Sequence, residues 1–404
     1  MTNTSTVPFP AGPSDPRPAA NAAIAVLALA IPVLVSALPL AIVPGMLRMA
    51  QVFGDMTAQF VLTLPGILMI VGAALCGYLS ERWGRKAVII GALAFYSVGG
   101  VGGFFATNLS ALVVSRAIGG LSAGVLLTTV YALIGEYFTG HRRERLLGFM
   151  SMASSIASVG LLVLMGMVVE RFGWRAPFLF YMLGLALVPF AVVGITGGKA
   201  LGTGVVLSWR PVLRRWPIYL LLTAYTIGMF ILVIQGPFLL GEKGITSPST
   251  AGRLIALSSV FGAVGGACYG RLRRSLGFRE MFVFISLTIG IGMLIAAWSS
   301  GVGFFLVSTV VIGLGIGIIE PTIASELLTG TPEPLHDRVM GVNVAAMFLG
   351  QFLNPVVVAP IHAIGGTTLA FIVIGSAYVA GGLLFLLAVV RKPDRGGARP
   401  EAAG

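Results

Sequence analysis

Charged residues are scarce in this sequence, and their scarcity excludes an ordinary water-soluble domain. Of its 404 residues, 26 are Lys or Arg and 14 are Asp or Glu, so that 10% of the chain is charged while 57% is apolar. A soluble domain needs about 25% charged residues to cover its surface. With a mean hydropathy of +0.97, most of the surface of this chain must face lipid.

Other residue types that carry chemistry are few or isolated. The two cysteines, Cys76 and Cys268, lie in separate apolar runs, and the three histidines stand alone, so the sequence offers neither a disulfide framework nor metal-ligand spacing. It contains no nucleotide-binding P-loop that would indicate ATP as an energy source. The net charge of +12 does not indicate nucleic acid, because the basic residues are scattered between apolar runs. We expect no cofactor, no metal and no nucleic-acid partner.

Long uncharged runs are what the sequence does contain. A membrane-spanning helix needs about 20 apolar residues. Six runs hold one helix each, and three longer runs, interrupted near residues 107–110, 299–301 and 362–366, hold two each. The single runs are 18–47, 56–80, 146–169, 176–198, 216–241 and 254–270, and the double runs are 87–135, 281–327 and 339–390. The pattern predicts an all-α membrane protein with twelve transmembrane helices.

The basic residues predict how the chain is oriented. Most Lys and Arg residues fall in loops on one side of the expected membrane, at residues 82–86, 142–145, 199–215, 271–279 and 338 and in the tail after 390. Because such residues collect in cytoplasmic loops, both termini are expected in the cytoplasm. The polar first twenty residues lack the pattern of a cleaved signal peptide. We expect a bacterial-type cytoplasmic (inner) membrane protein that acts as a monomer in the lipid bilayer.

An internal repeat divides the chain into two halves. At one offset of 193 residues, Gly120 and Gly124 match Gly313 and Gly317, Gly77 matches Gly270, and the segments starting at residues 144 and 337 also match. Such repeats indicate two pseudo-symmetric six-helix bundles with a binding site between them. The expected divisions are a disordered cytoplasmic N-terminus 1–20, a bundle 21–196, a cytoplasmic linker 197–216, a bundle 217–390 and a cytoplasmic tail 391–404.

One short loop carries a family resemblance. Residues 77–86 read Gly-Tyr-Leu-Ser-Glu-Arg-Trp-Gly-Arg-Lys, which resembles the cytoplasmic loop signature of the major facilitator superfamily, and Arg116 with Gly120 and Gly124 resembles that family's R-x-x-x-G-x-x-x-G element. The resemblance implies a twelve-helix transporter similar to the bacterial drug and metabolite antiporters driven by protons. It also implies a conformational latch, for which the candidates are Gly77, Glu81, Arg82, Gly84, Arg85, Lys86 and, as the partner of Glu81, Arg145. Alternatively, this loop only sets the orientation of the chain.

Two charged residues lie inside expected helices, where a charge is costly and is often functional. Glu320 lies deep in its helix, with no cation at hydrogen-bond spacing on that helix, and precedes Pro321, which permits a kink. It is the candidate site of proton coupling; the alternative is a neutral carboxyl group hydrogen-bonded inside the bundle. Arg116 lies about 8 Å below the outer face. It is a candidate for coupling or substrate binding together with Asp55, or it reaches the interface or pairs with Asp55 structurally.

Milder polar residues complete the candidates. Those expected to line a central cavity are Tyr131, Tyr225, Gln235, Asn343, Gln351 and Asn354, although any one of them can instead be a hydrogen-bonding contact between helices. Tyr225 and Gln235 differ by about 80° around one helix and should share a broad face. The predicted function is a secondary transporter that moves a small organic solute by alternating access, in exchange for protons.

Other functions compete with export as explanations of the sequence. Within transport, the alternative is proton-linked or facilitated uptake. An enzyme would need a cluster of catalytic groups inside the membrane, and a sensor would usually need a soluble output domain; the sequence shows neither.

Overall fold

The computed structural model describes residues 18–138, 140–195, 209–329, 331–332 and 335–391, and every regular element within them is a helix. The predicted N-terminal segment 1–20, the linker 197–216 and the tail 391–404 lie wholly or largely outside these residues. The longer helices are α1 (Pro18–Leu40), α3 (Asp55–Trp83), α4 (Arg85–Phe105), α5 (Leu109–Tyr137), α6 (Gly140–Phe172), α10 (Trp216–Glu242), α11 (Pro248–Ser275), α12 (Phe278–Trp298), α13 (Val302–Thr329) and α14 (His336–Arg391).

Shorter helices extend or connect these elements. They are η1 (Val43–Gly45), α2 (Met46–Phe53), η2 (Ala176–Met182), α7 (Leu183–Ala186), α8 (Val188–Gly194) and α9 (Arg210–Leu213). Among the described residues, 11 helical segments are long and apolar enough to cross a membrane, and one of them, Arg338–Leu387, is twice the usual length. That segment lies in α14, which consists of two helices joined at Gly365 and Gly366. The predicted all-α architecture with twelve crossings is therefore confirmed.

Glycines with positive φ and capping side chains mark the ends of several helices. Gly84 has φ +79°, a left-handed conformation that favours glycine, and it makes the tight turn between α3 and α4. At the predicted break near 107–110, the Asn108 side chain accepts a hydrogen bond from the Ala111 N–H (2.8 Å) and caps α5. In α14, Gly366 has φ +73°, and the Glu242 carboxylate accepts hydrogen bonds from the Thr367 and Thr368 N–H groups that begin the second helix.

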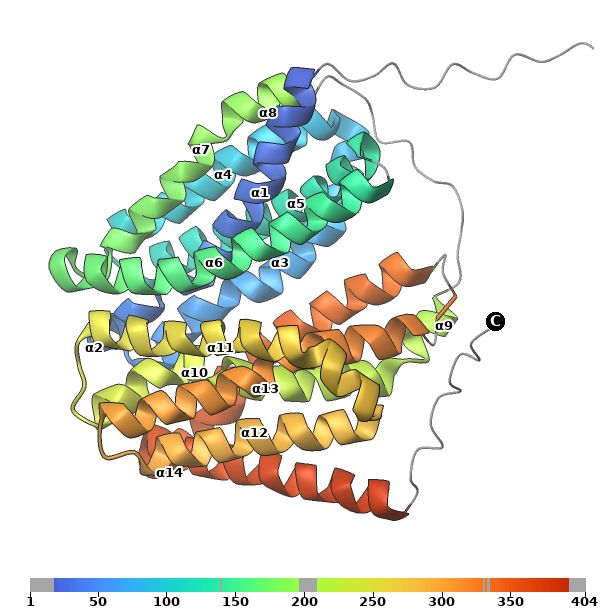
Figure 1. Cartoon of the computed structure of the whole chain (residues 1–404). Coiled ribbons are helices and arrows are strands. Elements are labelled where there is room, and N and C mark those ends of the chain that lie inside the picture. Colours follow the sequence, from blue (N-terminus) through green and yellow to red (C-terminus); the bar gives the residue numbers. More distant parts are fainter. Residues whose placement is uncertain (1–17, 139, 196–208, 330, 333–334, 392–404) are drawn as a thin grey trace, which may run out of the picture.

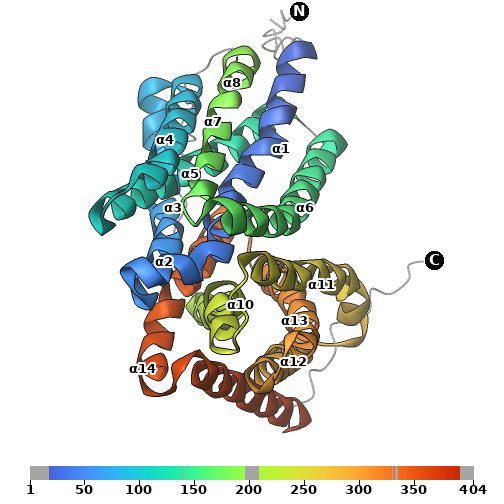
Figure 2. The same ribbon diagram turned by 90° about the vertical axis from the view of Figure 1, so that its left-hand side faces the viewer.

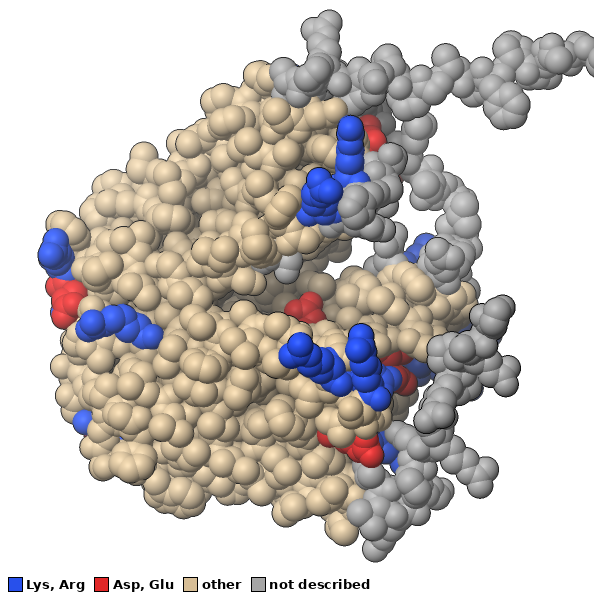
Figure 3. All heavy atoms as spheres, in the orientation of Figure 1, with Lys and Arg blue, Asp and Glu red and all other residues tan. Residues whose placement is uncertain are grey.

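The helices form two bundles, α1–α8 and α10–α14, which we call the N-half and the C-half (Figures 1 and 2). In Figure 1 the halves meet at the left and separate at the right. The closed end is the end where α3 begins at Asp55 and α10 ends at Glu242, and the open end is the end of the Gly84 turn. Figure 3 shows a hollow between the halves that opens toward the side where most visible Lys and Arg atoms lie.

Corresponding glycines hold the helices of each half together. In the N-half, a Cβ on Gly124 of α5 would meet the Met69 carbonyl oxygen of α3. In the C-half, a Cβ on Gly317 of α13 would meet the carbonyl oxygen of Gly262 of α11, which is residue 69 plus the repeat offset. These glycines permit backbones to approach as only small residues allow. The repeat seen in the sequence is thus the same helix-packing contact made twice.

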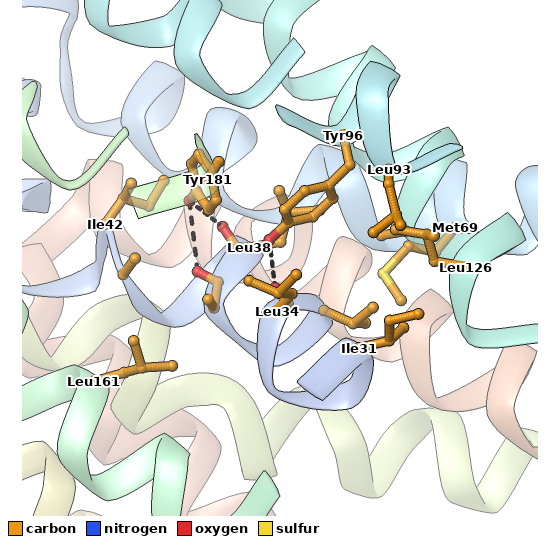
Figure 4. Close-up of a cluster of buried hydrophobic side chains, with 14 of the residues drawn as sticks. Ile31, Leu34, Leu38, Ile42, Met69, Leu93, Tyr96, Leu126, Leu161 and Tyr181 are labelled. Atoms are coloured by element: carbon orange, nitrogen blue, oxygen red, sulfur yellow. Dashed lines mark hydrogen bonds between the residues drawn. The ribbon is translucent and has the colours of Figure 1, made fainter. Parts of the chain in front are cut away.

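Two tyrosines are buried in the core of the N-half, where they meet α1. Tyr96 of α4 and Tyr181 of η2 are fully buried, and their hydroxyls donate to the carbonyls of Leu34 and Leu38, as Figure 4 shows. Both rings also pack edge to face. Because the hydroxyls have partners, these large rings are buried without leaving an unpaired polar atom.

Candidate functional site

A cavity of about 870 Å³ lies between the two halves. Four helices of each half line it: α1, α3, α5 and α6 of the N-half and α10, α11, α13 and α14 of the C-half. These are corresponding helices of the repeat, so the cavity lies around the axis that relates the halves. Its size is within the range of small-molecule sites.

Glu320 supplies the negative charge of this cavity. It lies on α13, is exposed to the cavity, and is the one charged side chain among the described residues that line it. Tyr131 of α5 lines the same cavity from the other half. Pro321 lies beside Glu320 and lines the same space. A solute in the cavity therefore meets one carboxyl group and no basic side chain among the described lining residues.

The rest of the lining is apolar or weakly polar. Hydroxyl groups come from serines of both halves, and flexible thioether side chains come from methionines of both halves. These residues are Ser36, Ser154, Ser155, Ser158, Ser258, Ser259, Met69, Met150, Met229 and Met347. Methionine side chains adapt to irregular shapes. The walls thus suit solutes that are largely apolar and differ in shape.

A buried amide network joins the halves at the closed end. Gln235 Nε2 of α10 donates to Gln59 Oε1 of α3 across the interface (2.8 Å) and to Asn354 Oδ1 of α14 within the C-half (3.2 Å). Asn354 in turn donates from Nδ2 to the Ile227 carbonyl oxygen (2.8 Å). All three amide side chains are buried. The network lies between the cavity and the closed end, and within it the Gln59 to Gln235 hydrogen bond is the one that crosses between the halves.

Two further polar contacts cross the same end. His362 Nε2 of α14 lies 3.8 Å from Asp55 Oδ2 at the start of α3. The Ser247 hydroxyl, which caps α11, donates to Glu170 Oε1 of α6 (3.0 Å). Beside it, α6 and α11 approach closely, since a Cβ on Gly252 would meet the Leu162 carbonyl oxygen. The closed end is therefore held by polar contacts, by close backbone packing and by apolar side chains of both halves, among them Phe60 and Phe352.

Arg116 lies inside the N-half and away from the cavity. Its side chain is 1% exposed. Nε donates to the Val61 carbonyl oxygen (3.1 Å), Nη2 to the Leu38 carbonyl oxygen (2.5 Å) and Nη1 to the Tyr181 hydroxyl (3.2 Å). Leu38 is near the end of α1, where carbonyls lack helical partners and a cation is favourable. The suggested pairing of Arg116 with Asp55 is wrong, because the guanidinium is used by backbone carbonyls and Asp55 faces His362 instead.

The loop 77–86 lies at the open end. Arg85, which begins α4, forms an ion pair with Glu136 near the end of α5, so the charge pair here is not the expected one between Glu81 and Arg145. Glu81 and Arg145 are both exposed. Arg82 donates to the Tyr78 hydroxyl (3.1 Å), and Lys86 Nζ donates to the Val192 carbonyl oxygen (2.6 Å). Gly77 has open space around its Cα, and Gly84 makes the turn. The latch remains a prediction.

The expected set of lining residues needs correction. Tyr131 and Gln351 line the cavity. Tyr225 instead hydrogen-bonds with Ser286 of α12 and packs on Phe282, so it does not share the face of Gln235, which meets α3 and α14. Asn343 is buried and is not among the lining residues. Gln235 and Asn354 lie in the closed-end network. An angle of 80° on a helix surrounded by neighbours is enough to place two side chains in different interfaces.

Sequence reasoning missed two residues that matter here. Gln59 forms the hydrogen bond between halves, and Glu136 is the partner of Arg85. A signal was available for Gln59, because it is a strongly polar side chain one turn inside an apolar run. Glu136 lies at the edge of its run, where a charge is ordinary.

Comparisons with known proteins agree on one family. The family model described as Major Facilitator Superfamily matches residues 22–333 and 240–404. The chain is 24% identical over 318 residues to the quinolone resistance protein NorA of Staphylococcus aureus. The aligned region covers 74% of this chain and 81% of that protein. It is 34% identical over 123 residues to the niacin transporter NiaP of Acinetobacter baylyi, covering 30% of this chain but only 27% of that protein.

The fold is also that of solved transporters. The inward-open conformation of the xylose transporter XylE from E. coli superposes with a TM-score of 0.69 at 15% identity, over 90% of this chain and 95% of that chain. At this identity the likeness establishes the fold alone.

Proposed function

The chain belongs to the major facilitator superfamily, and from this premise we propose that it exports a small organic solute in exchange for protons. The coarser part of this statement is established: the chain is a multi-pass membrane transporter of the secondary type and not an enzyme. The direction, the coupling ion and the class of solute are proposed. The observation that carries the proposal is the position of Glu320, which faces the cavity between the halves without a basic partner among the described lining residues.

The carboxyl group in the cavity gives a physical reason for the exchange of a proton with a solute. In a cavity that closes to water at both ends, a bare carboxylate is costly, by about 2.5–3.5 kcal/mol at the bilayer centre on insertion scales. A proton on Glu320 removes that cost, and so does a solute that places a positive charge or a hydrogen-bond donor against it. The change of conformation then proceeds with one ligand or the other bound, and the two are exchanged across the membrane.

The order of the transport steps is part of this proposal. We propose that the open end faces the cytoplasm, as the basic loops predict. The present state then takes up solute from the inside and releases the proton from Glu320, while Gln59, Gln235 and Asn354 keep the outer end closed. Opening of the outer end releases the solute, and a proton from outside returns to Glu320.

Export is favoured over uptake by two features. The match to a protein named for quinolone resistance covers three quarters of this chain. The cavity walls are apolar and rich in methionine, and suit an amphipathic compound better than a heavily hydrated nutrient. The second candidate is proton-linked uptake of a small metabolite, which the shorter match to a niacin transporter supports. In that case the same carboxyl group would carry the proton in the same direction as the solute.

The test compares Glu320→Gln with Glu326→Gln in proteoliposomes. Both substitutions remove a carboxylate from α13 at nearly constant volume, but Glu326 is not among the lining residues of the cavity. A panel of labelled amphipathic cations and neutral compounds is offered with and without a pH gradient. We expect Glu320→Gln to keep solute-for-solute exchange and to lose accumulation driven by the gradient, while Glu326→Gln keeps both.

Two results would contradict the proposal. Gradient-driven accumulation by Glu320→Gln with an unchanged pH profile would show that Glu320 is structural. Solute and protons that move in the same direction in the unmodified protein would replace export by uptake.

A further inference from the structure

One contact across the closed end involves a side chain that changes its charge near neutral pH. His362 Nε2 of α14 and Asp55 Oδ2 of α3 are 3.8 Å apart, within the distance of an ion pair but beyond that of a hydrogen bond. The pair joins the halves, because α14 belongs to the C-half and α3 to the N-half. The two side chains are 30% and 48% exposed, so protons can reach the pair while this end is closed.

The helices around His362 supply few other charges. On α14 itself, residues 339–390 contain no Lys, Arg, Asp or Glu. Helices α3, α10, α12 and α13 pack on α14. Residues 281–319 of α12 and α13 are uncharged, and the charge of α3 at this end is Asp55. The remaining charges come from the end of α10, where Glu242 accepts hydrogen bonds from the Thr367 and Thr368 N–H groups and Lys243 follows.

Other charged side chains near the closed end bond within their own half. Those with a backbone carbonyl partner in the same half are Arg48 with Val169, Arg175 with Ala106, Lys243 with Ala297 and Arg253 with Ser249. Glu170 does cross the interface, but its partner is the neutral Ser247 hydroxyl, and a carboxylate keeps its charge down to about pH 4.3. Among these described contacts, the His362–Asp55 pair is therefore the one between halves that can gain or lose an attraction near neutral pH.

The attraction exists in one protonation state and one conformation. An exposed histidine becomes charged below about pH 6.5, whereas an aspartate stays charged down to about pH 3.9. Between these values, the protonated imidazole and the carboxylate attract each other while the end is closed. Opening separates the halves and removes the attraction. A proton on His362 thus binds the closed state better than the open state, and a ligand with such a preference shifts the population toward the state it favours.

We propose that a proton taken up by His362 from the medium at the closed end stabilises the closure of this end by attracting Asp55. The inference rests on the proposed function for the orientation alone, in which this end faces the outside. External acid then favours closure of the outer end, the step that follows return of a proton to Glu320. His362 is not among the lining residues of the cavity, so its proton is separate from the coupling proton. The ratio of closed to open protein should change by about 1.4- to 5-fold, the effect of an exposed ion pair.

The experiment measures how fast a cysteine in the closed end reacts with an impermeant thiol reagent in intact cells. Every chain carries Ser249→Cys as the reporter, because Ser249 is buried at this end, together with Cys76→Ser, Cys268→Ser and Glu320→Gln. The last substitution prevents the carboxyl group in the cavity from contributing to the pH dependence. Rates are measured at an outer pH of about 5.5 and of about 8, on either side of the titration of a histidine.

Four variants are compared with this parent chain. Asp55→Asn and His362→Gln each remove one charge of the pair, and His362→Lys fixes a positive charge at the same place. His336→Gln is the matched control, since His336 is also on α14 but lies at the open end, where its ring bonds the Thr331 carbonyl oxygen (2.9 Å). The ratio of a variant's rate to the parent's rate at one pH cancels the pH dependence of the thiol.

We expect Asp55→Asn and His362→Gln to react about 1.4- to 5-fold faster than the parent at the acidic pH and at the parent's rate at the alkaline pH. His362→Lys should react slowly at both, and His336→Gln should match the parent. Equal acceleration at both pH values would show that the pair acts without its proton, and no acceleration at the acidic pH would show that it does not act; either result overturns the proposal.

The same ratios are measured in permeabilised cells, where the buffer reaches both faces of the membrane. A wrong orientation would abolish labelling in intact cells but leave these ratios as expected. A failure of the proposed coupling through Glu320 would not alter them either, because Glu320 is replaced in every chain and no solute is added.

Discussion

Removing the amide hydrogen bond between the halves should open the closed end of the transporter. In Gln235→Leu, Gln59 Oε1 loses the donor that the structure gives it and stays buried while this end is closed. A buried acceptor without a partner costs about 1–3 kcal/mol. Water reaches Gln59 when the end opens, so the cost falls on the closed state alone. The population open at this end should therefore rise about 5- to 150-fold.

The reverse substitution should have a smaller effect. In Gln59→Leu, Gln235 Nε2 keeps its hydrogen bond to Asn354, so the loss is closer to the net value of one hydrogen bond, about 0.5–1.5 kcal/mol. In the double variant two apolar side chains face each other, and replacing both partners of a hydrogen bond by apolar groups often leaves the free energy of the closed state nearly unchanged. The double variant should thus resemble the unmodified protein more than Gln235→Leu does, which is a large coupling in a double-mutant cycle.

A single reporter cysteine measures the opening. Ser249 of α11 is buried beside Gly166 of α6 at this end, so Ser249→Cys, with Cys76 and Cys268 replaced by Ser, should react slowly with an impermeant thiol reagent in intact cells. Gln235→Leu should speed the labelling most. Gln51→Leu, the same change at an exposed site on α2, is the control. If Gln235→Leu labels at the control rate, or if the effects of the single variants simply add, this hydrogen bond does not hold the end closed.

Two further predictions concern residues outside the cavity. Arg116→Met should lower the thermal unfolding temperature in detergent, because three buried oxygens lose a charged hydrogen-bond donor, at a cost of about 1.5–3 kcal/mol each. In the protein that remains folded, the number of protons exchanged per solute should stay the same. A changed number would instead show that Arg116 takes part in coupling. Glu81→Ala should lower the transport rate more than the apparent affinity, since a latch stabilises one conformation without touching solute, and normal transport at normal expression would show that the loop only sets orientation.

The architecture was predictable because it follows from one-dimensional properties of the chain. Run lengths, breaks at Asn108 and Gly366, and the glycine repeat all depend on local chemistry or on spacing along the sequence. The partners of polar side chains were not predictable in this way. A helix that is apolar on all sides gives no sequence signal for its rotation about its axis, so the sequence does not show that Tyr225 faces α12 and not the cavity. The partner of Arg116 depends on where the end of α1 lies in space, which no spacing reveals.

Helix contacts within each half differ from those between the halves, and the difference indicates which contacts separate during transport. Within each half, α3 packs on α5 and α11 on α13 through glycines whose backbones meet along the helices, as at Gly124 and Gly317. Between the halves, the described contacts at the closed end include hydrogen bonds, the contact of α6 with α11 at Gly252, and apolar side chains of both halves such as Phe60 and Phe352. The contacts between the halves are thus gathered at one end, whereas those within each half follow the helices, which favours rocking of one half against the other about the cavity. Glu320 is on the C-half side of that interface and Tyr131 on the N-half side, so a proton or a solute between them alters the one interface that must move.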